Sequence, residues 1–198
     1  MQPSLKINEI FYSLQGEGAN TGLPFVFVRL AKCNLTCSYC DTEFVSYKEI
    51  ALDEILSELL KYNCKRILWT GGEPLLQLDQ SILEWFLERG YQNFLETNGS
   101  IKPPDNGFNY ITVSPKVAVH VVERNFKDFI IHELRQPISI GRYLPEYSEH
   151  KTILKKYASP VFQGDEPDIE TIRYVTELVK ENPEWSMSIQ THKLLNLK

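Results

Sequence analysis

Short apolar runs recur along the chain and are separated by polar segments. Runs of four to six residues rich in β-branched and aromatic side chains predict strands. We expect these strands at residues 6–11, 25–30, 66–70, 93–96, 110–113, 128–131, 160–163 and 186–190. The segments 102–107 and 135–149 are rich in Pro, Gly and polar residues, and they predict loops.

Three longer segments place apolar residues three or four positions apart, which predicts amphipathic helices packed on a core. The first carries Leu52, Ile55, Leu56, Leu59 and Leu60, the second Leu78, Ile82, Trp85 and Phe86 before Gly90, and the third Ile172, Val175 and Val179 after Asp168. Strands that alternate with helices predict right-handed βαβ units. The expected fold class is therefore α/β, with a parallel sheet and helices on its outside.

Unusual polar motifs follow several of the predicted strands directly. TGGEP (70–74), ETNG (96–99), SPK (114–116) and QGDE (163–166) each come after one strand, and a cysteine-rich loop follows the strand at 25–30. The carboxyl ends of parallel strands open onto one face, where α/β proteins build their sites. The pattern therefore predicts that five loops converge on a single site.

Composition narrows the kinds of partner. The 198 residues carry a net charge of −5, with a pI near 5.5, and this acidic balance argues against nucleic acid as a partner. The sequence has no charged leader before an apolar stretch and no apolar run long enough to span a membrane. We expect a cytoplasmic protein with one domain over residues 1–198 and a small molecule or a protein as partner.

Three of the four cysteines lie within eight positions, at Cys33, Cys37 and Cys40. In a reducing compartment such a cluster binds metal or takes part in catalysis more often than it forms disulfides. Three thiolates from one loop can ligate three irons of a [4Fe–4S] cluster and leave the fourth iron open to a ligand. Two alternatives stay open, namely a zinc site completed by Cys64 and three buried, inert cysteines.

The motif CNLTCSYC (33–40) has the CxxxCxxC spacing and, together with GGEP (71–74), resembles the radical S-adenosylmethionine superfamily. The resemblance implies a [4Fe–4S] cluster on the three cysteines, with S-adenosylmethionine bound to its open iron and cleaved to a 5′-deoxyadenosyl radical. The residues that it implies for S-adenosylmethionine binding are Tyr39, Cys40, Asp41, Gly72, Glu73, Ser114, Pro115, Lys116, Gln163, Gly164, Asp165 and Glu166.

Further motifs cover almost the whole chain. FYSLQGEGANTG (11–22), CDT (40–42), TGGEPLLQ (70–77), ETNG (96–99), SPK (114–116) and QTHK (190–193) together resemble the 7-carboxy-7-deazaguanine synthase family. The resemblance implies conversion of 6-carboxy-5,6,7,8-tetrahydropterin to 7-carboxy-7-deazaguanine, with loss of ammonia, on the route to queuosine. It further implies an incomplete parallel βα barrel, a homodimer, a Mg²⁺ requirement and a flavodoxin- or ferredoxin-like electron donor. A complete barrel typically needs about 250 residues, so the chain length agrees with a reduced one.

The same resemblance implies roles for individual residues at the substrate. Leu14, Gln15, Gly16 and Glu17 are expected to line the pterin pocket, Arg29 to pair the substrate carboxylate, Thr70 to contact substrate, Thr42 to bind Mg²⁺, and the main-chain carboxylate of Lys198 to face the substrate if the chain ends there. Amide and carboxylate oxygens suit the N–H groups of a pterin, and a guanidinium suits a carboxylate.

Two other functions remain open from the sequence. One is a radical enzyme that acts on a protein partner, although QGEG (15–18) and Arg29 suit a small polar substrate better. The other is a non-enzymatic module that holds zinc or a cluster, which would leave TGGEP and SPK without a purpose. The sequence assigns no side chain as a catalytic acid or base, and it gives no role to residues 135–149.

Overall fold

The structure is a computed structural model that describes residues 3–38, 40, 45–148, 152–162 and 166–197. The strands in this part of the chain are β1 (Ser4–Leu14), β2 (Pro24–Leu30), β3 (Lys48–Ala51), β4 (Arg66–Gly71), β5 (Gln92–Thr97), β6 (Tyr110–Val113), β7 (Glu133–Ile138), β8 (Lys156–Pro160) and β9 (Trp185–Met187). The helices are α1 (Leu52–Leu59), α2 (Gln80–Leu87), α3 (Val119–Phe126), α4 (Ile169–Glu181) and α5 (Thr191–Leu194), with 3₁₀ turns η1 (Gly18–Asn20) and η2 (Pro74–Leu76).

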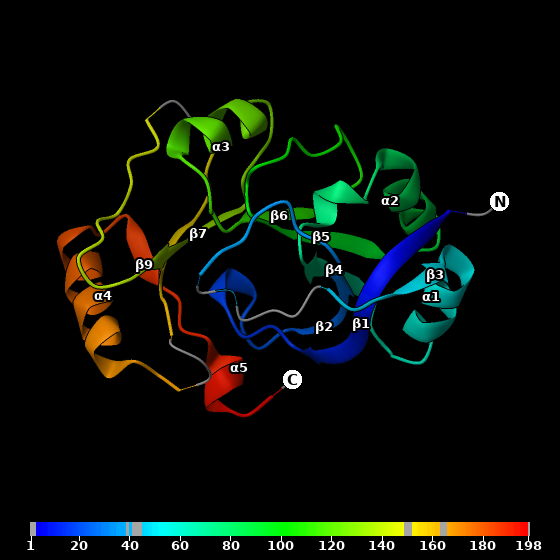
Figure 1. Ribbon diagram of the computed structural model, residues 1–198, viewed down its shortest axis with the longest axis horizontal. Helices are drawn as coiled ribbons and strands as arrows, with labels where there is room; N and C mark the ends of the chain where they lie inside the picture. Colours follow the sequence, from blue (N-terminus) through cyan, green and yellow to red (C-terminus); the bar gives the residue numbers. More distant parts are fainter. Residues whose placement is uncertain (1–2, 39, 41–44, 149–151, 163–165, 198) are drawn as a thin grey trace.

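All nine of these strands form one sheet in the order β3-β1-β2-β4-β5-β6-β7-β8-β9. From β2 onward every neighbouring pair is parallel, whereas β1 runs antiparallel to both β2 and β3. The edge strands β3 and β9 do not pair with each other, so the barrel is open. The sheet curves around a centre with α1 to α4 on its outer side (Figure 1). The predicted fold class, an incomplete parallel βα barrel, is confirmed.

One apolar cluster joins the first half of the sheet to α1 and α2. Ile55 and Leu59 of α1 and Phe86 of α2 are fully buried there, as the helical spacing predicts. Trp69 of β4 packs edge to face on Phe86, and its indole N–H donates to the Asn93 side chain at 2.9 Å. Leu60, which the sequence placed on the buried stripe, is instead 63% exposed because α1 ends at Leu59.

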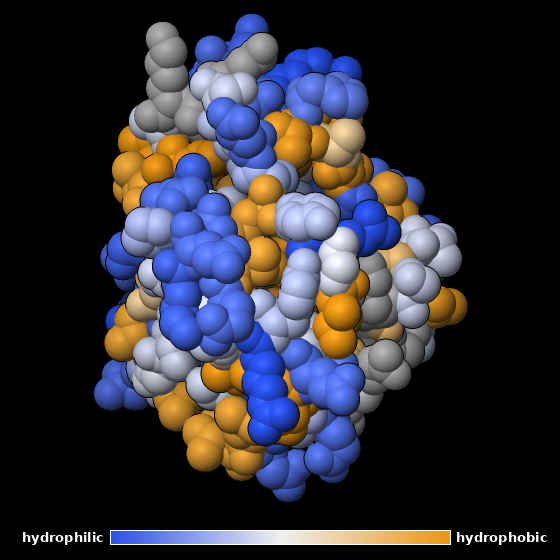
Figure 2. Space-filling model, turned by 90° about the vertical axis from the view of Figure 1, so that its left-hand side faces the viewer, coloured by the Kyte–Doolittle hydropathy of each residue, from blue (hydrophilic) through white to orange (hydrophobic). Residues whose placement is uncertain are grey.

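A second apolar cluster lies between the later strands and the helices α3 and α4. The predicted helix after Asp168 is α4, and the Asp168 carboxylate caps it by accepting from the backbone N–H groups of Glu170 and Thr171. Val175 packs inward, while a band of hydrophilic residues runs down the face of the molecule on which α4 lies (Figure 2). No helix among the described residues has the length and hydropathy needed to cross a membrane.

The structure corrects several element boundaries. Residues 128–131 do not form the predicted strand. Strand β7 covers Glu133–Ile138 instead and runs into the segment 135–149, which was expected to be a loop. Strand β8 ends at Pro160, where the sequence predicted a strand to begin, and β9 covers Trp185–Met187 rather than 186–190. Strand β3 and helix α3 were not predicted. The other predicted strands coincide with β1, β2, β4, β5 and β6 to within a few residues.

Candidate active site

A cavity of about 230 Å³ opens at the carboxyl ends of the parallel strands. Four of the five loops that the sequence placed there contribute lining residues, and further ones come from residues 159–162, which precede the QGDE loop, and from other segments. The lining residues are Glu17, Cys33, Leu35, Cys37, Cys40, Thr70, Gly71, Gly72, Glu96, Thr97, Asn98, Ser114, Lys116, Arg135, Pro137, Ser159, Pro160, Val161, Phe162, Gln190 and Lys193. The predicted convergence of separate loops on one site is therefore present in the structure.

The GGEP loop packs directly on the chain that leads into the cysteine loop. Gly72 N–H donates to Leu30 O at 2.8 Å, and Glu73 N–H donates to Lys32 O at 2.9 Å. A Cβ on Gly72 would overlap the Lys32 carbonyl, so glycine is needed for this close approach. The backbone of Gly72 and Glu73 thus holds in place the chain that leads into Cys33.

The cysteines line one wall of the cavity, and two N–H groups point at the Cys33 sulfur. Leu35 N–H lies 3.5 Å from Cys33 Sγ, and the Asn98 side-chain amide lies 3.8 Å from it. Burial raises the pKa of the Cys37 thiol, while the charge of Lys116 lowers it. Thiols from one loop, with N–H donors to a sulfur and a cation nearby, form a donor set that fits an iron–sulfur cluster.

Cys64 does not belong to this site. It is 7% exposed, packs in the first apolar cluster, and its thiol lies within hydrogen-bonding distance of Pro24 O and Arg66 O. Within the described residues, no three His, Cys, Asp or Glu side chains converge on the position of a single metal ion. The alternative of a zinc site completed by Cys64 is therefore wrong.

Glu73, expected at the S-adenosylmethionine methionine group, is fully buried and does not line the cavity. Its carboxylate accepts from Leu75 N–H at 3.1 Å, the Thr97 hydroxyl at 2.8 Å and Asn98 N–H at 2.8 Å. Burial raises the pKa of Glu73, against the opposing effect of these three hydrogen bonds. The side chain joins the loops after β4 and β5, and thereby also orients Asn98.

The SPK motif contributes two of its three residues to the cavity. Ser114 and Lys116 line it, and Lys116 Nζ donates to Ser114 Oγ at 2.8 Å, whereas Pro115 is buried behind them. Glu166, the last residue of the QGDE motif, is exposed and is not among the lining residues.

The QGEG segment contributes one lining residue and two supporting ones. Glu17 lines the cavity, while Gln15 is 6% exposed and donates from its side chain to Glu96 Oε1 at 3.0 Å. Gly16 O accepts from both the backbone and the hydroxyl of Thr191 in α5, each at 2.9 Å. Leu14, the last residue of β1, is 40% exposed and does not reach the cavity.

Arg29 and Thr70 are partners in the parallel ladder between β2 and β4, but only Thr70 lines the cavity. The Arg29 guanidinium lies 3.4 Å from a Glu9 carboxylate oxygen and 5.2 Å from the centre of the Phe11 ring. In this structure Arg29 is thus paired with a protein carboxylate rather than directed into the cavity.

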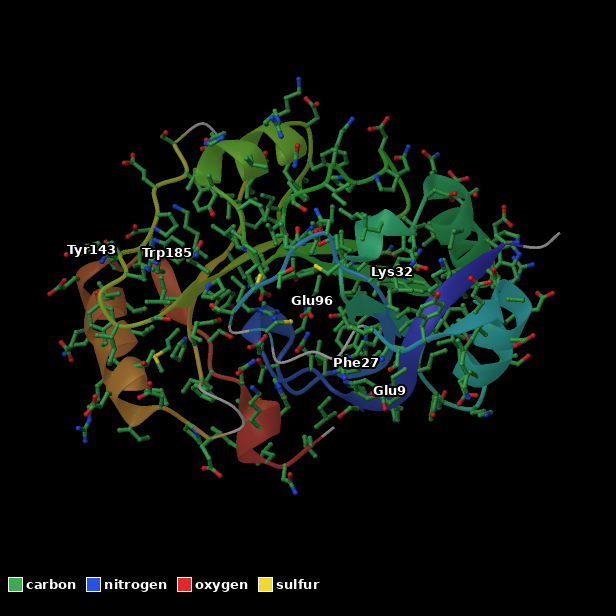
Figure 3. All side chains as sticks on the ribbon, viewed as in Figure 1. Glu9, Phe27, Lys32, Glu96, Tyr143 and Trp185 are labelled. Carbon is green, nitrogen blue, oxygen red and sulfur yellow. The ribbon has the colours of Figure 1, made fainter. Side chains whose placement is uncertain are left out.

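Several lining residues were not assigned from the sequence. Glu96 and Asn98 lie in the ETNG motif, and Gln190 and Lys193 in QTHK, so these motifs were noticed without roles for their members. Figure 3 shows Glu96 in the middle of the molecule, on the concave side of the sheet. Arg135 gave no signal, because it lies in a stretch that resembles a loop.

Seven of the predicted site residues lie outside the described residues, and the structure gives no position for them. They are Tyr39, Asp41, Thr42, Gln163, Gly164, Asp165 and Lys198.

Comparison with known proteins agrees with this geometry. The Radical SAM superfamily profile matches residues 28–115, which include the cysteine loop and the motifs after β4, β5 and β6. The chain is 37% identical over 194 residues to the 7-carboxy-7-deazaguanine synthase of Bacteroides thetaiotaomicron, covering 98% of both chains. It is 38% identical over 206 residues to that of Haemophilus influenzae, covering 100% of this chain and 96% of the relative. The crystal structure of QueE from Escherichia coli shares the fold, with a TM-score of 0.71 at 22% identity over 94% of each chain.

The open barrel and its cysteine loop are those of a radical S-adenosylmethionine enzyme, a class whose members hold a [4Fe–4S] cluster and S-adenosylmethionine. Within that class, the chain belongs to the 7-carboxy-7-deazaguanine synthase family. Membership of this family favours the function of a 7-carboxy-7-deazaguanine synthase over the two alternatives, an activase for a protein partner and a structural metal module.

Proposed function

We propose that the protein converts 6-carboxy-5,6,7,8-tetrahydropterin to 7-carboxy-7-deazaguanine in the cavity at the carboxyl ends of the strands. One observation carries the proposal. The same cavity has three cysteines on one wall and, around the rest, carboxylates at Glu17 and Glu96 and ammonium groups at Lys116 and Lys193. Such a surface offers acceptors for the N–H groups of a pterin and cations for a carboxylate.

The chain's own residues would bind the reactants, orient them and exclude water. Leu35, Pro160, Val161 and Phe162 supply apolar surface among the polar groups of the cavity. When bound, the cluster and S-adenosylmethionine supply one-electron reduction and a hydrogen-abstracting group. Ser114, Lys116 and Gly72 are our candidates for holding S-adenosylmethionine beside the three cysteines, with Glu73 fixing the loops from behind.

Five further features belong to the proposal and come from the family resemblance. Thr42 would give its hydroxyl to Mg²⁺, which prefers oxygen ligands. Arg29 would exchange Glu9 for the substrate carboxylate, and, where the chain ends at Lys198, its main-chain carboxylate would face the substrate. We also propose a homodimer and a flavodoxin- or ferredoxin-like electron donor.

The test is an anaerobic assay of reconstituted protein with S-adenosylmethionine, a reductant, Mg²⁺ and the tetrahydropterin. Product is followed by mass spectrometry. We expect 7-carboxy-7-deazaguanine from the wild type, none from Cys33→Ala, and product from Cys64→Ala, a matched control in which a buried cysteine outside the site is lost. Formation of 5′-deoxyadenosine without the deazaguanine would show that the proposed substrate is wrong. Omission of Mg²⁺ and the Thr42→Ala variant test the metal separately.

A further inference from the structure

Arg135 of β7 forms the centre of a network of charges in which Arg135 and Glu133 are buried and Glu17 and Glu96 are partly exposed. Its guanidinium donates to Glu17 Oε2 at 2.6 Å, to Glu96 Oε1 at 3.0 Å and to Glu133 Oε1 at 2.7 and 2.8 Å. Arg135 itself is 4% exposed. One side chain thus connects the loop after β1, the end of β5 and the start of β7.

The charges in this network do not balance. Burial alone would lower the pKa of Arg135, but the charges of Glu17, Glu96 and Glu133 together raise it, so the guanidinium stays protonated. Three carboxylates around one cation leave two negative charges uncompensated within the network. Buried charge without a counterpart is costly, so the excess favours a ligand that brings positive or N–H donor groups.

Glu133 is satisfied within the protein and supports Arg135 from behind. It is fully buried, accepts from Ala19 N–H at 3.0 Å, and has the Tyr110 hydroxyl at 3.4 Å. Gly18 leaves room for this carboxylate, because a Cβ there would overlap it. The uncompensated charge is consequently presented to the cavity by Glu17 and Glu96.

Both of these carboxylates keep acceptor capacity toward the cavity that they line. The Oε2 atom of Glu96 accepts from the Thr70 hydroxyl at 3.1 Å, and among the described residues Glu17 Oε1 has no hydrogen-bond donor. Arg135 Nη1 holds the other oxygen of each side chain, which fixes both carboxylates relative to each other.

We propose that Arg135, supported by Glu133, is a positioning residue that sets Glu17 and Glu96 as acceptors for the 2-amino group and the neighbouring ring N–H of a 2-amino-4-oxopyrimidine. An ionised carboxylate only accepts, so it pairs with these N–H groups and opposes the oxygen of a 2-oxo ring. The network therefore selects a pterin over the otherwise identical lumazine. The inference rests on the proposed function, because the tetrahydropterin carries this ring edge.

The test compares two ligands that differ only at the 2-position of the pyrimidine ring. Each is bound to the wild type and to a variant in which the net charge of the network is unchanged. Arg135→Gln alone would leave Glu133 buried without a cation, so the test variant is Glu133→Gln with Arg135→Gln, which removes one charge of each sign. Arg89→Gln, on an exposed arginine over Trp85, is the control. Dissociation constants of 6-carboxytetrahydropterin and 6-carboxytetrahydrolumazine are measured anaerobically by calorimetry on cluster-loaded protein, beside KM for S-adenosylmethionine, kcat and the melting temperature.

We expect the double variant to bind the pterin roughly 10- to 100-fold more weakly and to lose most of its preference over the lumazine. KM for S-adenosylmethionine should change much less, because the proposed function assigns that ligand to Ser114, Lys116 and Gly72 beside the cysteines. A structural role alone would lower the melting temperature and leave the preference between the two rings unchanged. A folded double variant that keeps the wild-type preference would therefore overturn the proposal.

The outcome also separates this inference from the proposed function. If the wild type makes the deazaguanine and the double variant keeps its ring preference, only the positioning role fails. If the wild type makes no deazaguanine but prefers the 2-amino ring, and the double variant loses that preference, only the proposed reaction fails. A wild type that binds both rings equally would overturn the selectivity assigned to Glu17 and Glu96.

Discussion

Replacing Gly72 by alanine tests whether the close packing of the GGEP loop positions the cysteine loop. The added Cβ would overlap Lys32 O and would stand 3.1 Å from Cys33 N. Since real Cβ atoms do not approach other atoms closer than 3.0 Å, the two segments have to separate. The change adds only a methyl group and leaves every charged group in place.

The cost follows from the contacts that separation breaks. Separation of the two segments breaks both the Gly72–Leu30 and the Glu73–Lys32 backbone hydrogen bonds, at 2.8 and 2.9 Å. At about 0.5–1.5 kcal/mol each, their loss lowers the free energy of unfolding by about 1–3 kcal/mol. For a protein of this length, that corresponds to a fall in melting temperature of roughly 2–12 °C.

The assay measures thermal unfolding, iron bound per chain after anaerobic reconstitution, and product formation. Gly90→Ala is a matched control, because Gly90 has φ of 76° but nothing within 4 Å of an added Cβ. That variant places an L-residue in the left-handed region at a cost of about 1–2 kcal/mol, at the amino end of β5 and therefore away from the cysteine loop, which follows the carboxyl end of β2. We expect both variants to lose stability and only Gly72→Ala to lose iron and activity as well.

Two results would refute the reasoning. Wild-type iron content in folded Gly72→Ala would show that the packing of this loop does not position Cys33. Equal loss of iron in Gly90→Ala would show that the cluster site responds to general destabilisation rather than to the local contact.

Three further predictions concern hydrogen bonds elsewhere. Asn98→Leu removes the amide near the Cys33 sulfur, so the cluster's reduction potential, measured by anaerobic titration, should become more negative; an unchanged potential would contradict this role. Asp79→Ala removes the cap of α2 and should cost about 1 kcal/mol at neutral pH. Hydrogen bonds lower the pKa of Asp79, so the carboxylate stabilises the folded protein above its unfolded-state pKa, and this stabilisation is lost as the pH falls through the folded-state pKa. Urea titrations at several pH values measure the free energy of unfolding of the wild type and of Asp79→Ala. A difference between the two that persists in acid would refute this. Trp69→Phe leaves the buried Asn93 side-chain oxygen unpaired and should lower the free energy of unfolding by about 1–3 kcal/mol. An unchanged midpoint of urea unfolding would contradict this prediction.

The helical part of the fold could be predicted because burial there follows simple periodicity. Ile55 and Leu59 point into the core, and Asp168 caps α4 as its residue type suggests. The early strands were equally clear, since one face of each packs under helices. The order of motifs along the chain then sufficed to predict that the loops meet.

Strand β7 was missed for a physical reason. Glu133 and Arg135 are buried inside the barrel by pairing with each other and with other side chains, so this central strand has polar residues where periodicity expects apolar ones. Pro137 adds a residue that is rare in central strands. The apolar run at 128–131 resembles a strand more closely but forms only one isolated bridge, between Ile131 and Ile153.

The site itself was only partly predictable. Residue type and spacing led to the cysteines, motif position to Ser114 and Lys116, and the family resemblance to Glu17, and all of these line the cavity. The roles of Glu73 and Gln15 as buried links between loops could not be inferred, because they depend on which main-chain groups tertiary packing brings to each side chain.

The hydrogen bonds between Gly16 and Thr191 join residues 175 positions apart, and this sets an order in time for a chain made from its N-terminus. At about 5–20 residues per second, the ribosome adds Thr191 roughly 10–35 s after Gly16. Gln190 and Lys193, which complete the cavity wall, arrive with it. During that interval the loop after β1 exists without its hydrogen bonds to α5. The cavity is therefore completed only after residues 190–193 have been made, and an iron–sulfur cluster delivered to the cysteine loop before then would meet a site with part of its wall still missing.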